Sequence, residues 1–556
     1  MQAGLGQLLS VDDDITAKMD FLLSDAASFA TITSLQSSIL RTLRSHRQIY
    51  VYGCGATGRL AKLMESTFWR PFWRRMRASP YWSRISEHVS STIDDSLIGE
   101  MTGADRALIS SLEGFEDLLL IGELQLHDRG VKRGDLVIGV TEGGETSSVI
   151  GTVLAGLHQW NESGASEAEI KEHLFFVYNN PDHLLAPFHR SASVLNESRI
   201  SKLNLATGPQ AITGSTRMQA TTSETFVIAT ALHCALDEFL RHTVGLNGDE
   251  MASIGFAGEP STVRTKLREF AQILTSVKEA TRDLSVFTRW ESECYSKHHF
   301  TTYFAQAGLM TVFIDSTERS PTFRLFALDT TTQDQRKAWI QVWTDATDIE
   351  SAWVSFLGRK FRGMEESQYL ARFQSEIVDP YLKATALRSL PNAGNDQERL
   401  YDFSFGEENI KRRGGIAPGD VGCLTLMNEN EYVLLRDPSS APSRFIRLFT
   451  STPTAADGLP TRVNVLIFHP NAQRDEVMKL FESQGLPTDR MNVAVFHNST
   501  ENDPLGIRPQ MAMKVRQGKQ VRRFSISSND LFHSLTLRLC LMFLISLFSV
   551  LDIRLP

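Results

Sequence analysis

Ile49-Tyr50-Val51-Tyr52 leads directly into Gly53-Cys54-Gly55-Ala56-Thr57-Gly58, and a helical pattern continues from Arg59 to Phe68. The first four residues are apolar and β-prone, and the next six form a loop with three glycines. This order predicts a strand, a tight loop and a helix. Glycine allows the backbone to turn sharply and to approach a ligand closely.

The same order recurs further along the chain. Leu136–Val140 is a second apolar run, Thr141-Glu142-Gly143-Gly144-Glu145-Thr146 forms its loop, and a helical pattern follows from Ser147. Leu174–Tyr178 is a third such run, and Ile200–Leu205 leads into Thr213-Gly214-Ser215-Thr216-Arg217 before a long helix. Alternating strands and helices predict an α/β fold with a doubly wound parallel sheet.

Length and composition set further limits. With 556 residues the chain is expected to form at least two domains. A net charge of -8 gives no overall electrostatic reason to bind nucleic acid or an anionic membrane. The five cysteines form no CxxC pair, which indicates a reducing compartment without structural zinc. We expect the protein in the cytoplasm, with the nucleus as a second compartment.

The terminal segments show no targeting signal. Met1 to Asp14 lacks the basic flank and apolar run of a secretory signal. Leu539–Leu551 is apolar but shorter than the roughly 20 residues of a membrane helix. We therefore expect a buried terminal helix there and no membrane partner.

The second half is less regular. Its candidate strands are Leu309–Ile314, Trp339–Trp343, Cys423–Met427 and Val463–Phe468, and Leu390–Gly419 is expected to be an exposed loop. The chain is accordingly divided into an N-terminal helical segment (1–35), a first α/β domain (36–255) and a second α/β domain with the apolar terminal helix (256–556).

The three loops of the first domain carry the candidate ligand-binding residues. In doubly wound sheets ligands bind beyond the carboxyl ends of the strands, and backbone N–H groups at helix starts favour a phosphate. Threonine and serine hydroxyls add donors, and arginine adds charge. The predicted set is Gly53, Gly55, Ala56, Thr57, Gly58, Arg59, Thr141, Gly143, Glu145, Thr146, Ser147, Thr213, Gly214, Ser215, Thr216 and Arg217.

Two other interpretations of the first loop remain open. A dinucleotide site requires an acidic residue about 20 positions further on, but residues 70–85 are rich in arginine, tryptophan and serine. A plain structural turn is the other alternative. The absence of a Walker-type lysine argues against nucleotide hydrolysis, and no cofactor is expected.

The sequence resembles one branch of the sugar isomerase (SIS) superfamily, the branch with N-acetylmuramic acid 6-phosphate etherases and glucokinase regulatory proteins. The similar motifs are Gly53–Leu60, Met101-Thr102-Gly103-Ala104-Asp105-Arg106-Ala107, Glu113-Gly114-Phe115-Glu116-Asp117 and Thr213–Met218. Thr141–Thr146 also resembles the Ser-x-Ser-Gly-Glu-Thr loop of SIS isomerases. The resemblance implies a flavodoxin-like sheet.

The second half carries a fainter likeness to the same branch. Ile314–Phe323 is similar to the etherase segment that follows the glycine loop, but the loop itself is reduced to Ala305-Gln306-Ala307-Gly308. Two SIS domains, the second degenerate, match the layout of the regulatory proteins. In those proteins a helical cap follows and completes the sugar site, and Leu551-Asp552-Ile553-Arg554 resembles its start.

The resemblance implies a sugar-phosphate ligand and favours a regulator over an enzyme. Etherases use two glutamates as acid and base. One corresponds to Glu116, while the other falls at Thr67, which does not exchange protons near neutral pH. The expected function is a glucokinase or hexokinase regulatory-type protein that responds to fructose phosphates. The alternatives are an etherase-like lyase, with Glu116 catalytic, or a phosphosugar isomerase.

Several residues also have purely structural interpretations. Glu116 suits a polar helix start. Glu142 and Glu145 place negative charge beside the proposed phosphate unless they face sugar hydroxyls. His298 and Cys294 share a helix face, but no second ligand pair completes a metal pattern, so no metal is expected.

Overall fold

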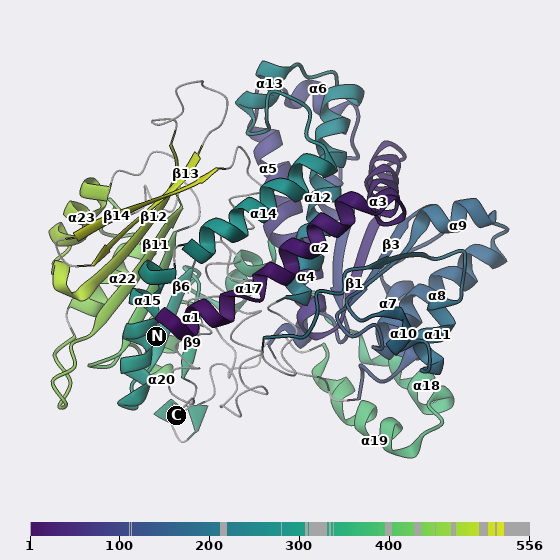
Figure 1. Cartoon of the computed structure of the whole chain (residues 1–556). Coiled ribbons are helices and arrows are strands. Elements are labelled where there is room, and N and C mark those ends of the chain that lie inside the picture. The colour runs from purple at the N-terminus through teal and green to yellow at the C-terminus, as the bar shows by residue number, and fades with distance from the viewer. Residues whose placement is uncertain are drawn as a thin grey trace. The chain divides into compact units, whose positions relative to one another are not determined.

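The computed structural model describes residues 2–109, 112, 114–211, 219–279, 281–305, 310, 331–332, 335–336, 339–394, 403–426, 435–450, 452–468, 474–499, 510–517 and 520–527. The chain forms two compact units, each with its own sheet (Figure 1). The N-terminal unit contains Val11–Ala271 and Phe361–Asp396. The C-terminal unit contains Met1–Ser10, Gln272–Lys360 and Gln397–Pro556.

The N-terminal unit is built on five parallel strands in the order β2-β1-β3-β4-β5. These strands are β1 (Ile49–Gly53), β2 (Leu97–Met101), β3 (Leu136–Thr141), β4 (Leu174–Tyr178) and β5 (Ser201–Asn204). The order is that of flavodoxin-like sheets. Strands β1 to β4 are buried along their whole length, because helices cover both faces, so their sequences are nearly continuous apolar runs.

The predicted order of strand, loop and helix is confirmed, but the helix after β1 begins at Gly55, four residues before the predicted start at Arg59. Helix α4 (Gly55–Leu63) follows β1, and α8 (Ser147–Glu162) follows β3. A π-helix, η1 (Met64–Trp69), continues α4 into α5 (Arg70–Ala78). Before β1 lie α2 (Asp12–Ser24) and α3 (Ala26–Arg44), separated at Asp25, whose carboxylate accepts from the Ser28 N–H at 2.8 Å.

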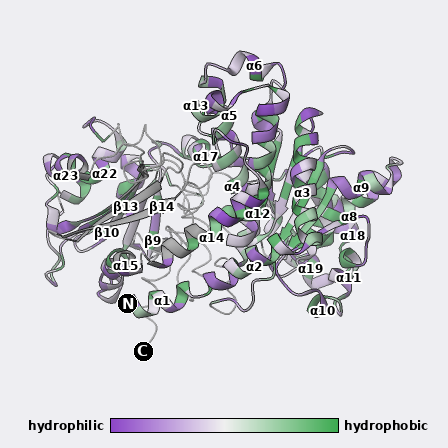
Figure 2. Cartoon of the chain, turned by 45° about the horizontal axis from the view of Figure 1, so that its top comes forward, coloured by the Kyte–Doolittle hydropathy of each residue, from purple (hydrophilic) through white to green (hydrophobic). Residues whose placement is uncertain are grey.

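The other helices of this unit pack on the sheet or on one another. They are α6 (Trp82–Ser86), η2 (Ile93–Asp95), η3 (Asp105–Leu108), α7 (Leu119–Asp128), α9 (Glu167–His173), α10 (Asp182–Leu185), α11 (His189–Leu195), α12 (Ala220–Glu238), η4 (Phe239–Thr243) and α13 (Gly248–Ser253). Helix α14 (Val263–Glu279) runs on into the other unit. Helix α7 packs on α8, and α3 packs on α12. Figure 2 shows hydrophobic residues on α3, α8 and α12, whereas α9 is mostly hydrophilic.

A segment from much later in the chain completes this unit. Helices α18 (Glu366–Glu376) and α19 (Pro380–Ser389), followed by η5 (Leu390–Asn392), pack on the region around α7. Their buried cluster joins Phe115, Leu118 and Ile121 to Tyr369 and Phe373. The N-terminal unit is therefore discontinuous in sequence. The domain boundaries expected at residues 35 and 255 stay predictions.

The C-terminal unit repeats the same strand order. Its parallel strands are β6 (Thr301–Ala305), β9 (Ile340–Trp343), β10 (Val421–Leu426), β11 (Arg462–Phe468) and β12 (Met491–Ser499). They are ordered β12-β11-β10-β6-β9, and β13 (Gln510–Gln517) and β14 (Gln520–Ser527) extend the β12 edge in antiparallel fashion. The α/β class with two doubly wound sheets is confirmed.

The helices of the C-terminal unit are α1 (Gln2–Leu9), α15 (Thr281–Ser296), α17 (Ile349–Leu357), α20 (Glu407–Arg413), α22 (Ala441–Thr450), α23 (Arg474–Ser483) and η7 (Thr488–Arg490). A small two-stranded sheet joins β7 (Thr331–Thr332) to β8 (Gln335–Arg336). Within the described residues, no helix is long and apolar enough to span a membrane.

Predictions for this half had mixed outcomes. Strands β9, β10 and β11 confirm three candidates within two residues, and β6 was not predicted. The expected exposed loop at 390–419 is wrong for α20, whose Arg413 is 1% exposed because its guanidinium packs over the Trp343 ring. Leu309–Ile314, except for residue 310, and the apolar Leu539–Leu551 segment lie outside the described residues.

Candidate functional site

The carboxyl ends of the central strands meet at one edge of the N-terminal sheet. Gly53, the last residue of β1, pairs with Met101 at the end of β2 and with Val140 near the end of β3. The loops that begin at residues 54, 102 and 142 therefore start side by side. This is where open α/β sheets bind ligands.

The first loop requires its glycines for steric reasons. A Cβ on Gly53 would lie 2.4 Å from the Thr57 carbonyl carbon, and one on Gly58 would lie 2.4 Å from the Met101 Cβ. Gly55 has a φ of 56°, a left-handed conformation that favours glycine. The loop thus folds α4 back tightly on the ends of β1 and β2, which brings the N-terminus of α4 to the edge of the sheet.

The hydroxyl of Thr57 holds the start of α4. Its Oγ1 donates to the Cys54 carbonyl at 2.9 Å and accepts from the Cys54 N–H at 3.0 Å. Arg59 is 7% exposed and lies near Cys54, but its charge does not offset the burial that raises the pKa of that thiol. The Thr57 hydroxyl, expected to bind phosphate, is used here to cap the helix.

The loop after β3 is closed by contacts from β4 and α11. The hydroxyls of Thr141 and Thr146 lie 2.9 Å apart, and Ser191 donates to the Gly144 carbonyl at 2.8 Å. Asn180 donates to the Gly143 carbonyl at 2.9 Å. Helix α8 then begins at Ser147. A second helix N-terminus therefore lies at the same edge, and such N-termini attract anions.

Arg190 is a charged residue of this loop region that the sequence analysis missed. Its guanidinium lies 3.4 Å from the Glu145 carboxylate and 3.4 Å from the Ser147 hydroxyl, although α11 is distant from the loop in sequence. Arg190 offsets the negative charge that Glu145 brings to the proposed phosphate region. Only the fold places the two residues together, and no sequence motif indicates it.

Thr102 joins the two loops. Its backbone N–H donates to the Gly53 carbonyl at 3.0 Å, and its hydroxyl lies 2.7 Å from the Ser148 hydroxyl in the first turn of α8. The Tyr52 hydroxyl, 3.1 Å away, also contacts it. Thr102 lies in a motif that resembles the family, but the sequence analysis gave it no role.

Glu116 lies beside the first loop. The Ser148 N–H donates to the Glu116 carbonyl at 3.0 Å, and the Cys54 thiol approaches the Glu116 carboxylate at 3.8 Å. Removal from water, together with the negative charges of Glu116 and Glu142, raises the pKa of the Cys54 thiol to about 12. The thiol is therefore protonated at neutral pH and is not activated as a nucleophile.

Two further carboxyl groups lie near this edge, Glu142 directly after β3 and Glu224 on α12. Glu142 accepts from the Thr221 hydroxyl at 3.1 Å, and Glu224 accepts from the Asn179 side-chain amide at 2.7 Å. Glu224 is completely buried, and burial followed by the charge of Glu142 raises its pKa well above the ordinary value. Glu224 was not predicted, because its position on α12 has no motif to mark it.

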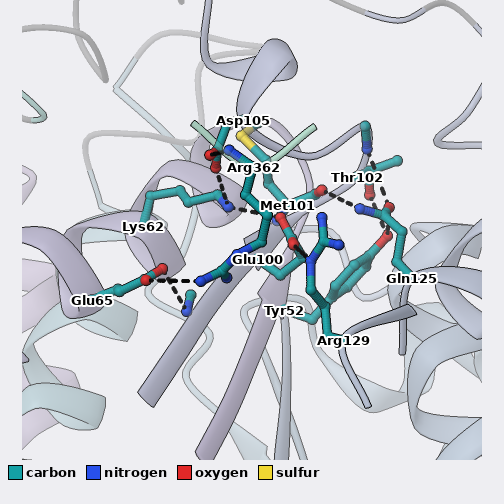
Figure 3. Close-up of polar contacts among 12 residues, drawn as sticks. Tyr52, Lys62, Glu65, Glu100, Met101, Thr102, Asp105, Gln125, Arg129 and Arg362 are labelled. Atoms are coloured by element: carbon teal, nitrogen blue, oxygen red, sulfur yellow. Dashed lines mark hydrogen bonds and ion pairs between the residues drawn. The ribbon is translucent and has the colours of Figure 1, made fainter. Parts of the chain in front are cut away.

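Behind the edge lies a buried ionic cluster, drawn in Figure 3. The Lys62 ammonium lies 2.7 Å from the Glu100 carboxylate and 2.6 Å from that of Asp105, and all three side chains are fully buried or nearly so. Arg129 also pairs with Glu100. Burial alone would raise the pKa of Glu100, but the charges of Arg129 and Lys62 lower it to about 2.

Glu65 belongs to the same cluster. Its carboxylate binds Arg70 at 3.0 Å, the Gly99 N–H at 3.2 Å, and lies 3.6 Å from Arg362. Glu65 is thus held by cations and is not placed to substitute for the acid or base absent at Thr67, a half-buried residue of η1.

The structure brings most of the predicted residues together. Those of the first two loops are Gly53, Gly55, Ala56, Thr57, Gly58, Arg59, Thr141, Gly143, Glu145, Thr146 and Ser147, with Glu116 beside them. The third predicted loop, Thr213–Arg217, lies outside the described residues. In the described part of the chain, no group of three histidine, cysteine or acidic residues is arranged to hold a metal ion.

Comparisons with known proteins agree with this architecture. Residues 31–157 match the family described as the glucokinase regulatory protein N-terminal SIS domain. An N-acetylmuramic acid 6-phosphate etherase of Vibrio campbellii is 30% identical over 135 residues, 24% of this chain and 37% of that protein. The etherase of Salmonella paratyphi B is 30% identical over 132 residues. The chain thus spans little more than a third of these relatives.

Solved structures align along nearly the whole chain at low similarity. The tagatose-6-phosphate ketose/aldose isomerase of Escherichia coli covers 97% of this chain and 92% of its own at 9% identity, with a TM-score of 0.38. A putative isomerase of the same kind from Clostridium novyi gives 8% identity and a TM-score of 0.41. The fold assignment rests on strand order and not on these two structures.

The fold and the glycine loops define a SIS-type α/β domain. Within that superfamily, residues 31–157 are similar to the N-terminal SIS domain of glucokinase regulatory proteins, and 24% of the chain is similar to an N-acetylmuramic acid 6-phosphate etherase.

Proposed function

We propose that the N-terminal unit binds a sugar phosphate and acts as a regulator of the glucokinase regulatory type. The observation that carries the proposal is the meeting of two helix N-termini, α4 and α8, at one sheet edge, joined by Thr102. Backbone N–H groups and helix dipoles at such ends attract a phosphate. Both helices are long enough to form regular N-terminal turns, with nine and sixteen residues.

A binding role is favoured over catalysis because one of the two residues needed for proton transfer is missing. Ether cleavage requires an acid and a base near the reacting atoms. Glu116 lies at the site, but the second glutamate of the etherases is replaced in this sequence by Thr67. Glu65 does not replace it, because its carboxylate forms an ion pair with Arg70. The protonated Cys54 thiol does not supply a base.

Calorimetric melting with candidate ligands tests the binding proposal. Fructose 6-phosphate, fructose 1-phosphate and N-acetylmuramic acid 6-phosphate are each added at millimolar concentration. A ligand that binds only the folded protein raises Tm. At a ligand concentration a hundred times Kd, it adds about 2.7 kcal/mol to the free energy of unfolding. If no sugar phosphate moves Tm, the proposal is wrong.

The second candidate function is an etherase-like lyase. The contact between Glu116 and Cys54 in the first loop, and the identity to the two etherases, favour it. Incubation with N-acetylmuramic acid 6-phosphate is expected to release little lactate. Robust release that disappears in Glu116→Gln, while Asp117→Asn retains it, would establish the lyase instead. An isomerase activity is tested with the same variants and a ketose phosphate.

The proposed partner is a hexokinase-type enzyme in the cytoplasm or the nucleus. If a fructose phosphate alters binding of that enzyme, the enzyme must alter the affinity for the fructose phosphate by the same factor. Arg217→Ala is expected to weaken the sugar effect and to leave kinase binding without sugar intact. Intact sugar-phosphate binding without any captured sugar kinase would leave a sensor with another partner.

A further inference from the structure

The turn that follows β2 has an unusual backbone. Gly103 has a φ of 90°, and Ala104, which carries a Cβ, has φ 59° and ψ -155°. A non-glycine residue rarely adopts this conformation, and it persists only where surrounding contacts fix it. The turn starts at Thr102, the residue that joins the two ligand loops.

A side chain of α7 and a hydrogen bond within the turn fix one side of it. The Gln125 side chain accepts from the Gly103 N–H at 3.2 Å and donates to the Met101 carbonyl at 3.0 Å. The Ala104 N–H donates to the same carbonyl at 2.8 Å. The bonds that join Gln125 to the Met101 carbonyl and to the Tyr52 hydroxyl are drawn in Figure 3.

The other side is fixed by a residue more than 250 positions away. The Arg362 N–H donates to the Asp105 carboxylate at 2.5 Å, and the Asp105 N–H donates to the Arg362 carbonyl at 3.2 Å. The second carboxylate oxygen of Asp105 lies 2.6 Å from the Lys62 ammonium. Asp105, which is fully buried, therefore joins the strained turn, helix α4 and the distant segment (Figure 3).

Further contacts attach the segment that begins at Arg362 to the region of Glu116. The rings of Phe115 and Phe373 meet edge to face at 5.6 Å between centroids. Gly114 lies against Thr385 of α19, and the Tyr369 hydroxyl donates to Asp128 at 2.8 Å. The two residues that precede Glu116 thus pack on α18 and α19.

We propose that Asp105 and the backbone of Arg362 are positioning residues of the ligand site, and that residues 361–394 are part of its framework. In sequence this segment lies between β9 and β10 of the C-terminal unit. It fixes the turn that holds Thr102 against Gly53 and Ser148, and it supports the loop of Glu116 from behind. The inference rests on the proposed sugar-phosphate function of those loops.

The proposal implies that ligand binding and the contact between Asp105 and Arg362 stabilise each other. If the contact of Asp105 with Arg362 favours the binding geometry of the loops, the ligand must favour that contact by the same free energy. Occupancy of the loops is therefore expected to reduce local opening at Asp105 and Arg362. Local opening is measured by amide hydrogen exchange.

The test is hydrogen exchange on the full chain with and without the sugar phosphate that raises Tm most. The amides of Asp105 and Arg362 are expected to exchange about tenfold more slowly in the complex. Asp105→Ala, which removes the acceptor for the Arg362 N–H, is expected to weaken the affinity about tenfold at a temperature where it is fully folded. Phe21→Ala, at a residue of α2 that is 49% exposed, is the control and is expected to bind as the wild type does.

The outcomes separate this inference from the proposed function. Absence of binding by every sugar phosphate overturns the proposed function. Binding with unchanged exchange at both amides, or with unchanged affinity in Asp105→Ala, overturns the positioning role and leaves the binding function intact. If Asp105→Ala does not fold, the exchange measurement on the wild-type protein decides the question.

Discussion

The two sheets share one strand order but differ at equivalent positions. The pairing of β1 with β2 places Glu100 beside Tyr52, and the pairing of β6 with β9 places Trp343 beside Phe304. Glu100 and Trp343 thus hold the same place in their sheets. Glu100 lies among Lys62 and Arg129, whereas Trp343 lies against Phe405 and the Arg413 guanidinium.

The central strands β1 and β6 also differ in their last residue. Gly53 ends β1, and Ala305 ends β6 at the matching position. A Cβ on Gly53 would meet the Thr57 carbonyl carbon at 2.4 Å, so alanine is incompatible with the first loop. The first sheet has a glycine and a charged cluster at this edge. The second has an alanine and an aromatic core there, so the two sheets share an architecture but differ in the side chains at equivalent positions.

The largest expected effect comes from removing the buried cation. In Lys62→Met, Glu100 and Asp105 lose their shared ammonium, and breaking a buried pair costs about 3–5 kcal/mol in the free energy of unfolding. Denaturant unfolding measures it. Arg133→Met removes a solvent-exposed ion pair with Glu169 and is expected to cost far less, because water screens such a pair. Equal losses in the two variants would show that the buried cluster does not stabilise this sheet.

Acid should destabilise the N-terminal unit through the same cluster. The pKa of Glu100 is about 2 in the folded protein, below its ordinary value of 4.5, so the unfolded chain binds the proton more tightly. The stabilisation is complete above about pH 4.5 and is lost as the pH falls toward 2, up to about 3 kcal/mol. Glu100→Gln is expected to flatten the Tm profile in this range. An unchanged slope would exclude Glu100 as its source.

Gly53→Ala gives β1 the same last residue as β6, which ends in Ala305. The added Cβ has no space, so we expect a loss of about 1–3 kcal/mol in stability and loss of the Tm increase with sugar phosphate. Gly258→Ala is the matched control, because its Cβ would meet no atom closer than 3.9 Å. Retained ligand binding in Gly53→Ala would mean that the glycine loop does not form the site.

Much of the fold was predictable because it depends on local patterns. Short apolar runs before glycine loops marked β1 and β3, and the loop glycines marked the edge where ligands bind. Strand β6, which begins Thr301-Thr302-Tyr303, was missed because its apolar run is brief and no glycine loop follows it.

The site was predictable only in part. Arg190, Glu224 and Arg362 reach it from distant segments, and their roles depend on tertiary packing. Thr57 was predicted to lie in a loop, but it lies in the first turn of α4, where its hydroxyl caps the helix, a detail that depends on backbone geometry.

Isothermal titration of the full chain with fructose 6-phosphate tests the central claim, that one of two similar sheets retains a sugar-phosphate site. The account predicts one mole of ligand bound per mole of chain, with binding abolished by Gly53→Ala and retained in Gly258→Ala. Two equivalent sites per chain, or binding that survives Gly53→Ala, would contradict it.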